Sequence, residues 1–291
     1  MTQVISEPRS TPQAAARPQM MPTRRDVHFG LPAERISDWN KGSVHLSQFM
    51  NTLSILFPVG ERFFIDAVRA YRDRITDPEL KKAVTAFIGQ EAMHGREHEE
   101  YNDALFAKVP EAAAVERFVA RFLGLLKKLP PRMRLNATIA LEHFTAILAD
   151  RLLIEEDILE GCEPRFAALW RWHALEETEH KAVAFDVWRT IAGNGPVANI
   201  ERGIGLLIAS LLLWAIVLPS YLLILRREGK LTDLKGWRLF FSYTFTKVPF
   251  FPRLLKPWLD YFRPSFHPWD HDNRHFLAQI DPLLDRLAKA A

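Results

Sequence analysis

The 291-residue sequence contains one cysteine, Cys162, which excludes an internal disulfide framework and any cysteine-rich zinc or iron–sulfur site. Glycine is also scarce, with 13 residues, and this favours helices over a loop-rich all-β design. The net charge of +3 is too small to indicate nucleic acid as a partner. Ten histidines and 35 acidic residues are therefore the ligand supply for any metal site, and a reducing, cytoplasmic compartment is expected.

The first 30 residues differ in composition from the rest. Four prolines, Pro8, Pro12, Pro18 and Pro22, stand among Ser, Thr, Gln and Ala, without an apolar run long enough for a signal peptide. We therefore expect residues 1–30 to be a disordered leader that takes no part in the fold.

Later prolines leave three long uninterrupted stretches, at 79–109, 132–163 and 165–195. Because proline is excluded from helix interiors but accepted in a first turn, these stretches predict long helices. Two tightly joined helix pairs with one long crossover are typical of a ferritin-like four-helix bundle, here over residues 40–195. The predicted helices are 58–75, 78–107, 131–160 and 164–192, with a shorter connecting helix at 111–129.

Glutamate and histidine recur on these four helices in a fixed order. The first and third helices each offer one glutamate, and the second and fourth each carry a Glu-x-x-His motif, whose two side chains share one helix face. This is the ligand order of dinuclear carboxylate bundles, and four carboxylates would balance the charge of two divalent ions. The residues are Glu61, then Glu91 and His94, then Glu142, then Glu177 and His180.

One Glu-x-x-His motif alone is common on solvated helices, whereas two motifs in alternation with two single glutamates are much harder to obtain by chance. His173 precedes Glu177 by four residues and is favoured as a seventh ligand over a core histidine. For His98 a position in a solvated charge cluster is slightly favoured. We expect His143 to face away from the ligands, and Glu176 and Glu179 to point off the ligand face.

The chain also resembles a known family. The segments GERFFIDAVR, FIGQEAMHGREHEEYN, ALEHFTA, WHALEETEHKAVAFDV and FRPSFHPWD resemble the bacterial family of predicted metal-dependent hydrolases, a ferritin-like group, over about residues 40–285. The pattern His173-x3-Glu177-x2-His180 is similar to that of p-aminobenzoate N-oxygenase-type di-iron enzymes, which add a third histidine. This resemblance, which stops at the ligand pattern, implies seven metal ligands: Glu61, Glu91, His94, Glu142, His173, Glu177 and His180.

Residues 200–291 are expected to form a hydrophobic and basic helical extension. Residues 203–225 carry no charge and would make a helix about 35 Å long, enough to cross a bilayer. Residues 226–263 carry nine Lys and Arg against three acids, so a simple span would conflict with the positive-inside tendency. An in-plane or re-entrant segment at the inner face of the membrane is favoured, and a buried core helix is the alternative. The segment 267–272 is expected to be a structured loop and no second metal site.

Three functions fit these features. The first is a di-iron oxidoreductase that activates O2 with two Fe2+/Fe3+ ions, oxidises an apolar small molecule and needs an external electron donor. The second is a two-metal hydrolase of an ester or amide, in which Mn or Zn could replace iron. The third is an iron-binding ferritin-like protein without catalysis, for which the hydrophobic extension has no evident use.

Overall fold

The computed structural model describes residues 20–290, and this part of the chain is all-helical, as predicted, with no strand. Short 3-10 or π turns join the longer helices. The longer helices are α1 Val44–Arg69, α2 Pro78–Lys108, α3 Pro110–Leu126, α4 Pro131–Ile154, α5 Pro164–His180, α6 Val183–Ala192, α7 Pro196–Arg227, α8 Leu234–Phe241, α9 Phe250–Asp260 and α10 Ile280–Ala290.

The predicted starts of two helices, at residues 78 and 164, are confirmed. Asp77 accepts a hydrogen bond from the backbone N–H of Glu79 at 2.9 Å, and Pro78 occupies the first turn of α2. Glu163 caps α5 in the same way, with Pro164 as the first helical residue. Beyond α6, Gly193 has a φ of 75°, the left-handed backbone that a helix stop requires.

Two predicted boundaries are wrong. The first helix begins at Val44 and passes through Pro58, because Ser43 caps it and nearly every side chain over 45–55 is buried. Tertiary burial there outweighs the cost of about 3 kcal/mol for proline inside a helix. The predicted helix 164–192 is two helices, since α5 ends at His180 and α6 begins at Val183. Neither a proline nor a glycine stands at this break, so no signal in the sequence marks it.

The other ends shift less. The connecting helix α3 ends at Leu126 where 129 was expected, and α4 ends at Ile154 where 160 was expected. Pro130 and Glu155, the residues that flank α4, both leave helical backbone angles, and a short 3-10 turn, Glu156–Ile158, takes the place of the last predicted turn.

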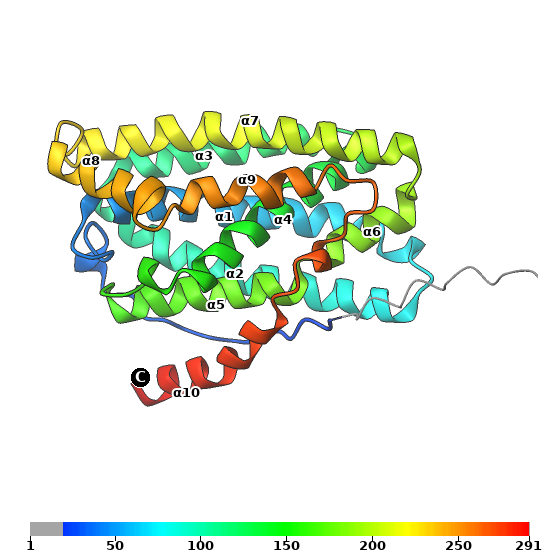
Figure 1. Cartoon of the computed structure of the whole chain (residues 1–291), viewed down its shortest axis with the longest axis horizontal. Coiled ribbons are helices and arrows are strands. Elements are labelled where there is room, and N and C mark those ends of the chain that lie inside the picture. The colour runs from blue at the N-terminus through cyan, green and yellow to red at the C-terminus, as the bar shows by residue number, and fades with distance from the viewer. Residues whose placement is uncertain (1–19, 291) are drawn as a thin grey trace, which may run out of the picture.

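The helices pack in a layered arrangement (Figure 1). Helix α1 lies along α2, and α4 lies along α5, so the two predicted pairs are present. Both pairs are in mutual contact, through α1 with α4 and through α2 with α5. Helices α7 and α9 cover α4 on the other side, and α7 also contacts α1 and α3. The hydrophobic core therefore continues from the paired helices into the C-terminal third.

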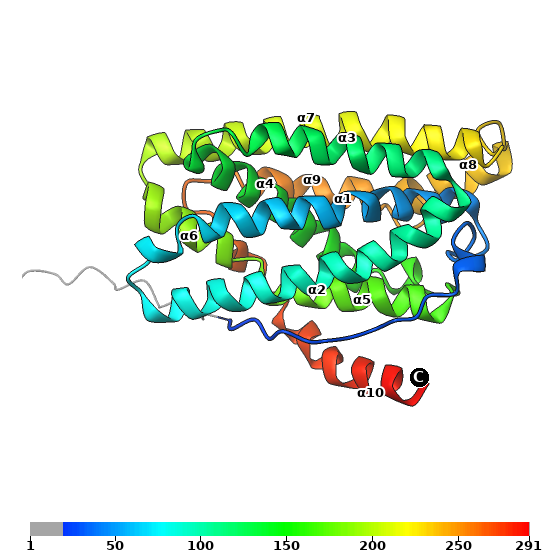
Figure 2. The ribbon, with the colours of Figure 1, turned by 180° about the vertical axis from the view of Figure 1, so that it is seen from behind.

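Residues 1–19 of the expected leader lie outside the described part of the chain. Residues 20–31, which we call the strap, are extended and run across α2 and α5 (Figure 2). The side chain of Arg25 reaches two glutamates of α5, and the backbone N–H of Phe29 donates to Glu97 on α2. The strap is thus packed on the fold, contrary to the expectation for residues up to 30.

Helix α7 is long and apolar enough to cross a membrane by length and composition, with a mean hydropathy of 2.4 in its most apolar window. Only 28% of that window is buried, so α7 is not an enclosed core helix. It lies lengthwise along the other helices, on α1, α3 and α4 (Figures 1 and 2).

Candidate metal centre

All seven side chains expected to bind metal converge in the core between α1, α2, α4 and α5. Each of them is at most 5% exposed, although four are carboxylates. They are Glu61 from α1, Glu91 and His94 from α2, Glu142 from α4, and His173, Glu177 and His180 from α5.

Six of the seven form two groups of three, each with one ligand atom per residue within 4.8 Å of the others. Each group could hold a metal ion. One group is Glu61, His94 and His173, and the other is Glu91, Glu177 and His180.

Glu177 stands between the two groups. Its Oε1 lies 3.2 Å from Nε2 of His173, 3.4 Å from Nε2 of His180 and 4.0 Å from Nδ1 of His94. One carboxylate therefore faces the imidazoles of both groups, as a bridging ligand would. Glu142 lies outside the groups of three, with Oε2 3.8 Å from Nε2 of His180.

Most of the inward-facing polar atoms are not paired within the protein. Within residues 20–290, nine buried oxygen and nitrogen atoms of these side chains make no hydrogen bond, although Nε2 of His180 lies 3.0 Å from Oε1 of Glu91. Buried polar atoms are normally paired, because desolvation without a partner costs free energy. A cluster of such atoms, all of them metal-ligand types, fits bound cations. The nine are both oxygens of Glu61, Glu91 and Glu142, Oε2 of Glu177, Nδ1 of His94 and Nε2 of His180.

The outward-facing nitrogens of two histidines are fixed by side chains behind them. Nε2 of His94 donates to Glu176 at 3.1 Å, and Nδ1 of His180 donates to Oε1 of Gln90 at 3.1 Å. These bonds fix which nitrogen of each ring faces the centre, and that nitrogen is a lone-pair donor whenever it carries no proton. Glu176 is thus off the ligand face, as expected from the sequence.

A third chain of hydrogen bonds holds His173. Its Nδ1 lies 2.7 Å from Nε2 of His98, and Nδ1 of His98 lies 2.8 Å from Oγ of Ser54, which donates to Asn102 at 2.7 Å. If Nε2 of His173 faces the metal, its Nδ1–H donates to His98, and His98 donates onward to Ser54. His98 is fully buried, so its expected place in a solvated charge cluster is wrong.

The strap supports the centre from outside. Arg25 Nη1 lies 3.0 Å from Oε1 of Glu176, which also accepts from Nε1 of Trp172 at 2.9 Å. Burial raises the pKa of Glu176 to about 8, an effect that Arg25 opposes. The sequence missed Arg25, because it lies among proline-rich residues, and Gln90, because an amide beside Glu91 has no distinctive signal.

Two other histidine-bearing features do not join the centre. His143 faces α9, where its Nε2 lies 3.1 Å from the backbone carbonyl oxygen of Pro257. It therefore points away from the ligands, as expected. In the loop after α9, His267 pairs with Asp186 at 3.0 Å and His271 with Asp260 at 3.3 Å. These side-chain contacts hold the segment in place, which agrees with its reading as a structured loop.

Burial and like charge strain the metal-free centre. The pKa values of Glu61 and Glu142 are held well above the usual range by burial and by repulsion from Glu91 and Glu177. Burial would lower the pKa of His180, but Glu177 and Glu91 raise it well above its usual value. The metal-free centre therefore retains protons that cations would displace.

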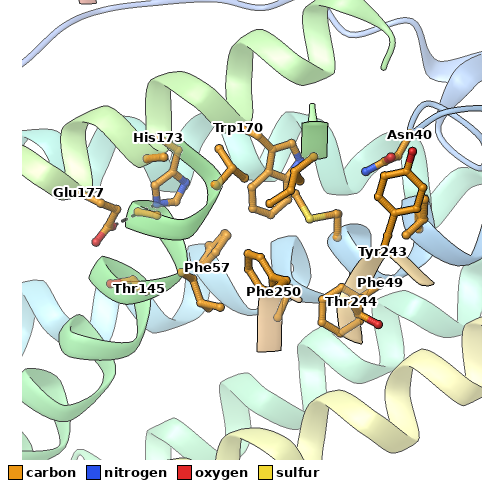
Figure 3. A pocket seen from close by; sticks show the side chains of 18 of the residues that line it. Asn40, Phe49, Phe57, Thr145, Trp170, His173, Glu177, Tyr243, Thr244 and Phe250 are labelled. Carbon is orange, nitrogen blue, oxygen red and sulfur yellow. Dashed lines mark hydrogen bonds and ion pairs between the residues drawn. The ribbon is translucent and has the colours of Figure 1, made fainter. Parts of the chain in front are cut away.

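Two cavities reach the centre. The narrower one, about 90 Å³, ends at His173 and Glu177 and is lined mainly by apolar side chains, Phe57 and Trp170 among them (Figure 3). A larger cavity of about 490 Å³ reaches Glu61. Small molecules thus have an apolar route to the ligand atoms.

The fold and the ligand groups define an all-helical protein with metal-binding side chains in its core. The chain belongs to the family described as predicted metal-dependent hydrolases, which it matches over residues 23–272. It matches no curated protein and no solved structure. The family description supports metal use and the hydrolytic alternative better than the oxidation expected first from the ligand pattern.

Metal uptake should release protons, because raised pKa values keep Glu61, Glu142 and His180 protonated in the metal-free protein. The apparent metal affinity should rise with pH, because at higher pH these side chains have already lost the protons that the metal would otherwise have to displace. Calorimetric titration in two buffers of different ionisation enthalpy measures the release. Glu99→Gln, an exposed site, should release as many protons as the wild type; a titration without proton release contradicts the assignment.

His98→Phe should lower metal affinity by about 10- to 100-fold, because His173 loses the group that orients it. His143→Phe is the matched control, since His143 is equally buried but faces Pro257. Competition against a chelator of known affinity measures the difference. Equal affinities of the two variants would show that His98 does not position a ligand.

Proposed function

We propose that the seven side chains hold two divalent metal ions in a ferritin-like four-helix bundle and that the chain is a dinuclear metal-dependent enzyme. The observation that carries this proposal is the pair of donor groups with nine unpartnered buried atoms. The bundle consists of α1, α2, α4 and α5, the four helices that supply the ligands.

The donor chemistry limits the metal. Carboxylate oxygens and imidazole nitrogens without a thiolate suit iron, manganese and zinc. Four carboxylates offset the charge of two divalent ions, which makes the loaded centre tolerable in an apolar core. We propose iron as the native metal for oxidation, with manganese or zinc as the metals for hydrolysis.

Hydrolysis is the first candidate reaction, because the family description names a metal-dependent hydrolase, and we propose an ester or amide in an apolar molecule as the substrate. A bound metal pair would supply an acidified water and polarise the substrate carbonyl. The chain's own contribution is to orient three imidazoles through Glu176, Gln90 and His98, and to line the approach with apolar side chains.

Oxidation of an apolar substrate by O2 is the second candidate, and the donor set is the observation that favours it. One glutamate from each of two helices and Glu-x-x-His from the other two is the pattern of di-iron carboxylate bundles. Such a pair would supply O2 activation and would need an external electron donor. The apolar walls around Phe57 would keep water from the reacting atoms.

Glu91→Ala and Glu177→Ala should each lower bound metal from two ions per chain to one or none. The reason is that each removes a buried carboxylate from the second donor group, and Glu177 faces both groups. Metal content after anaerobic reconstitution and desalting is the measurement. Glu99→Ala keeps two ions because Glu99 is half-exposed and pairs with Arg62. A wild-type chain that stays metal-free ends the proposal.

The two candidate reactions can be distinguished by the metal that each needs and by whether each consumes O2. For hydrolysis, zinc- or manganese-loaded protein should cleave p-nitrophenyl esters of fatty acids without O2, and Glu91→Ala should lose at least 100-fold of that activity. For oxidation, the iron(II) protein should consume O2 and change its visible spectrum, whereas the zinc protein should be inert. Hydrolysis by the zinc protein without O2 uptake by the iron protein would reject oxidation.

A further inference from the structure

The larger cavity lies between α1, α3, α4 and α7. At its inner end it includes Glu61, and it shares Phe57, Thr145 and Leu148 with the narrower cavity that reaches His173. Its volume of about 490 Å³ lies within the usual range of roughly 300–1,000 Å³ for small-molecule sites. The two cavities therefore lie next to each other beside the candidate metal centre.

The outer end of this cavity opens on the surface of α7. Four of its lining side chains are also exposed to solvent, between 37% and 54%, and they come from the connection between α3 and α4, from the start of α4 and from α7. The four are Leu129, Met133, Ile204 and Ile208. The mouth thus combines exposed apolar side chains with the partly exposed ion pair of Arg132 and Glu201, which also lines the cavity.

The mouth belongs to a continuous apolar stripe on α7. Eight large apolar side chains of this helix are exposed, at intervals of one, two or more turns that place them on one face. We call them the α7 stripe: Val197, Ile200, Ile204, Leu207, Ile208, Leu211, Leu218 and Leu222. The opposite face of α7 covers the other helices along its length (Figure 2), so α7 does not stand apart as an isolated span.

Cations stand at both ends of the stripe. Lys128 follows α3 at one end, and Arg226, Lys235 and Arg238 lie at the other, all exposed and without an ion-pair partner in residues 20–290. Positive charge at both ends fits a helix that lies in the plane of an anionic membrane surface. A second copy of the chain packed across the stripe would instead bring like charges together at each end.

We propose that the α7 stripe rests on an anionic lipid bilayer and that the larger cavity takes one hydrocarbon chain of a lipid from that bilayer. The hydrocarbon chain enters past Ile204 and Ile208 and extends to Glu61. For its chemistry this inference rests on the proposed function, because it makes a lipid acyl compound the substrate class. Binding of the hydrocarbon chain and docking on the membrane need no metal, so either can fail or succeed independently of the proposed function. In the cell this surface would lie at the inner face of the membrane.

Docking is tested by flotation of the full chain with vesicles of phosphatidylcholine, with or without 30% phosphatidylglycerol. The wild type should float with the anionic vesicles, and Ile200→Glu/Leu211→Glu should float at least tenfold less. Met21→Glu/Ile154→Glu is the matched control, because it adds the same two charges at exposed apolar residues of the strap and α4, outside the stripe. Wild-type protein left unbound, or a double variant that floats equally, overturns docking. So does light scattering that shows a dimer dependent on Ile200 and Leu211.

Binding of a hydrocarbon chain in the larger cavity is tested with radiolabelled palmitic acid. Equilibrium dialysis measures binding of the free acid, and a second assay measures its transfer from vesicles to the protein. Leu212→Trp should weaken binding at least tenfold because Leu212 lines the cavity, whereas its neighbour Leu211→Trp faces outward and should not. Ala137→Leu fills the cavity from α4 and replaces Leu212→Trp if that variant does not fold.

The same titration is run on metal-free and zinc-loaded protein. Saturable palmitate binding by the metal-free protein supports the cavity even if metal reconstitution fails, which separates the two proposals. Binding from the free acid but none from vesicles rejects the bilayer as the source. No saturable binding, or equal binding by Leu212→Trp and Leu211→Trp, overturns the cavity assignment.

Discussion

Four carboxylates lie in the core within reach of one another, and the need to neutralise them governs the structure around them. Carboxylates are rarely buried without a partner, since removing a charge from water costs several kcal/mol. Here the oxygens of Glu61 and Glu142 have no hydrogen-bond donor, and Glu91 has only Nε2 of His180 beside it, at 3.0 Å. The surrounding helices are therefore arranged to fit cations at the centre rather than to satisfy the carboxylates with protein groups.

The same constraint explains the polar layer behind the ligands. An imidazole can donate a lone pair inward only if its other nitrogen is held as an N–H donor. Glu176, Gln90 and His98 meet that requirement for the three histidines. Arg25 extends this support to the strap, so residues far from the ligands in sequence contribute to their orientation.

The C-terminal helices give the centre its surroundings. Helix α7 closes the larger cavity on one side and exposes the α7 stripe on the other. A polar centre beside a mainly apolar cavity suits a substrate with a hydrocarbon part. The hydrophobic C-terminal third is thus connected to the candidate centre through the lining of one cavity.

The sequence by itself determined the all-helical fold and the set of residues that meet in the core. Proline spacing marks helix starts at Pro78 and Pro164, and the Glu-x-x-His spacing fixes which side chains share a helix face, because both are local properties of the helix. The start of α1 at Val44, the role of His98 and the contacts of Arg25 were decided only by tertiary structure. Their cause is non-local: burial by other helices overrides the proline at 58, and a hydrogen-bond partner 75 or 151 residues away leaves no periodic trace. The placement of α7 likewise depends on tertiary structure, since an uncharged run fits a membrane span or a core helix until its neighbours are known.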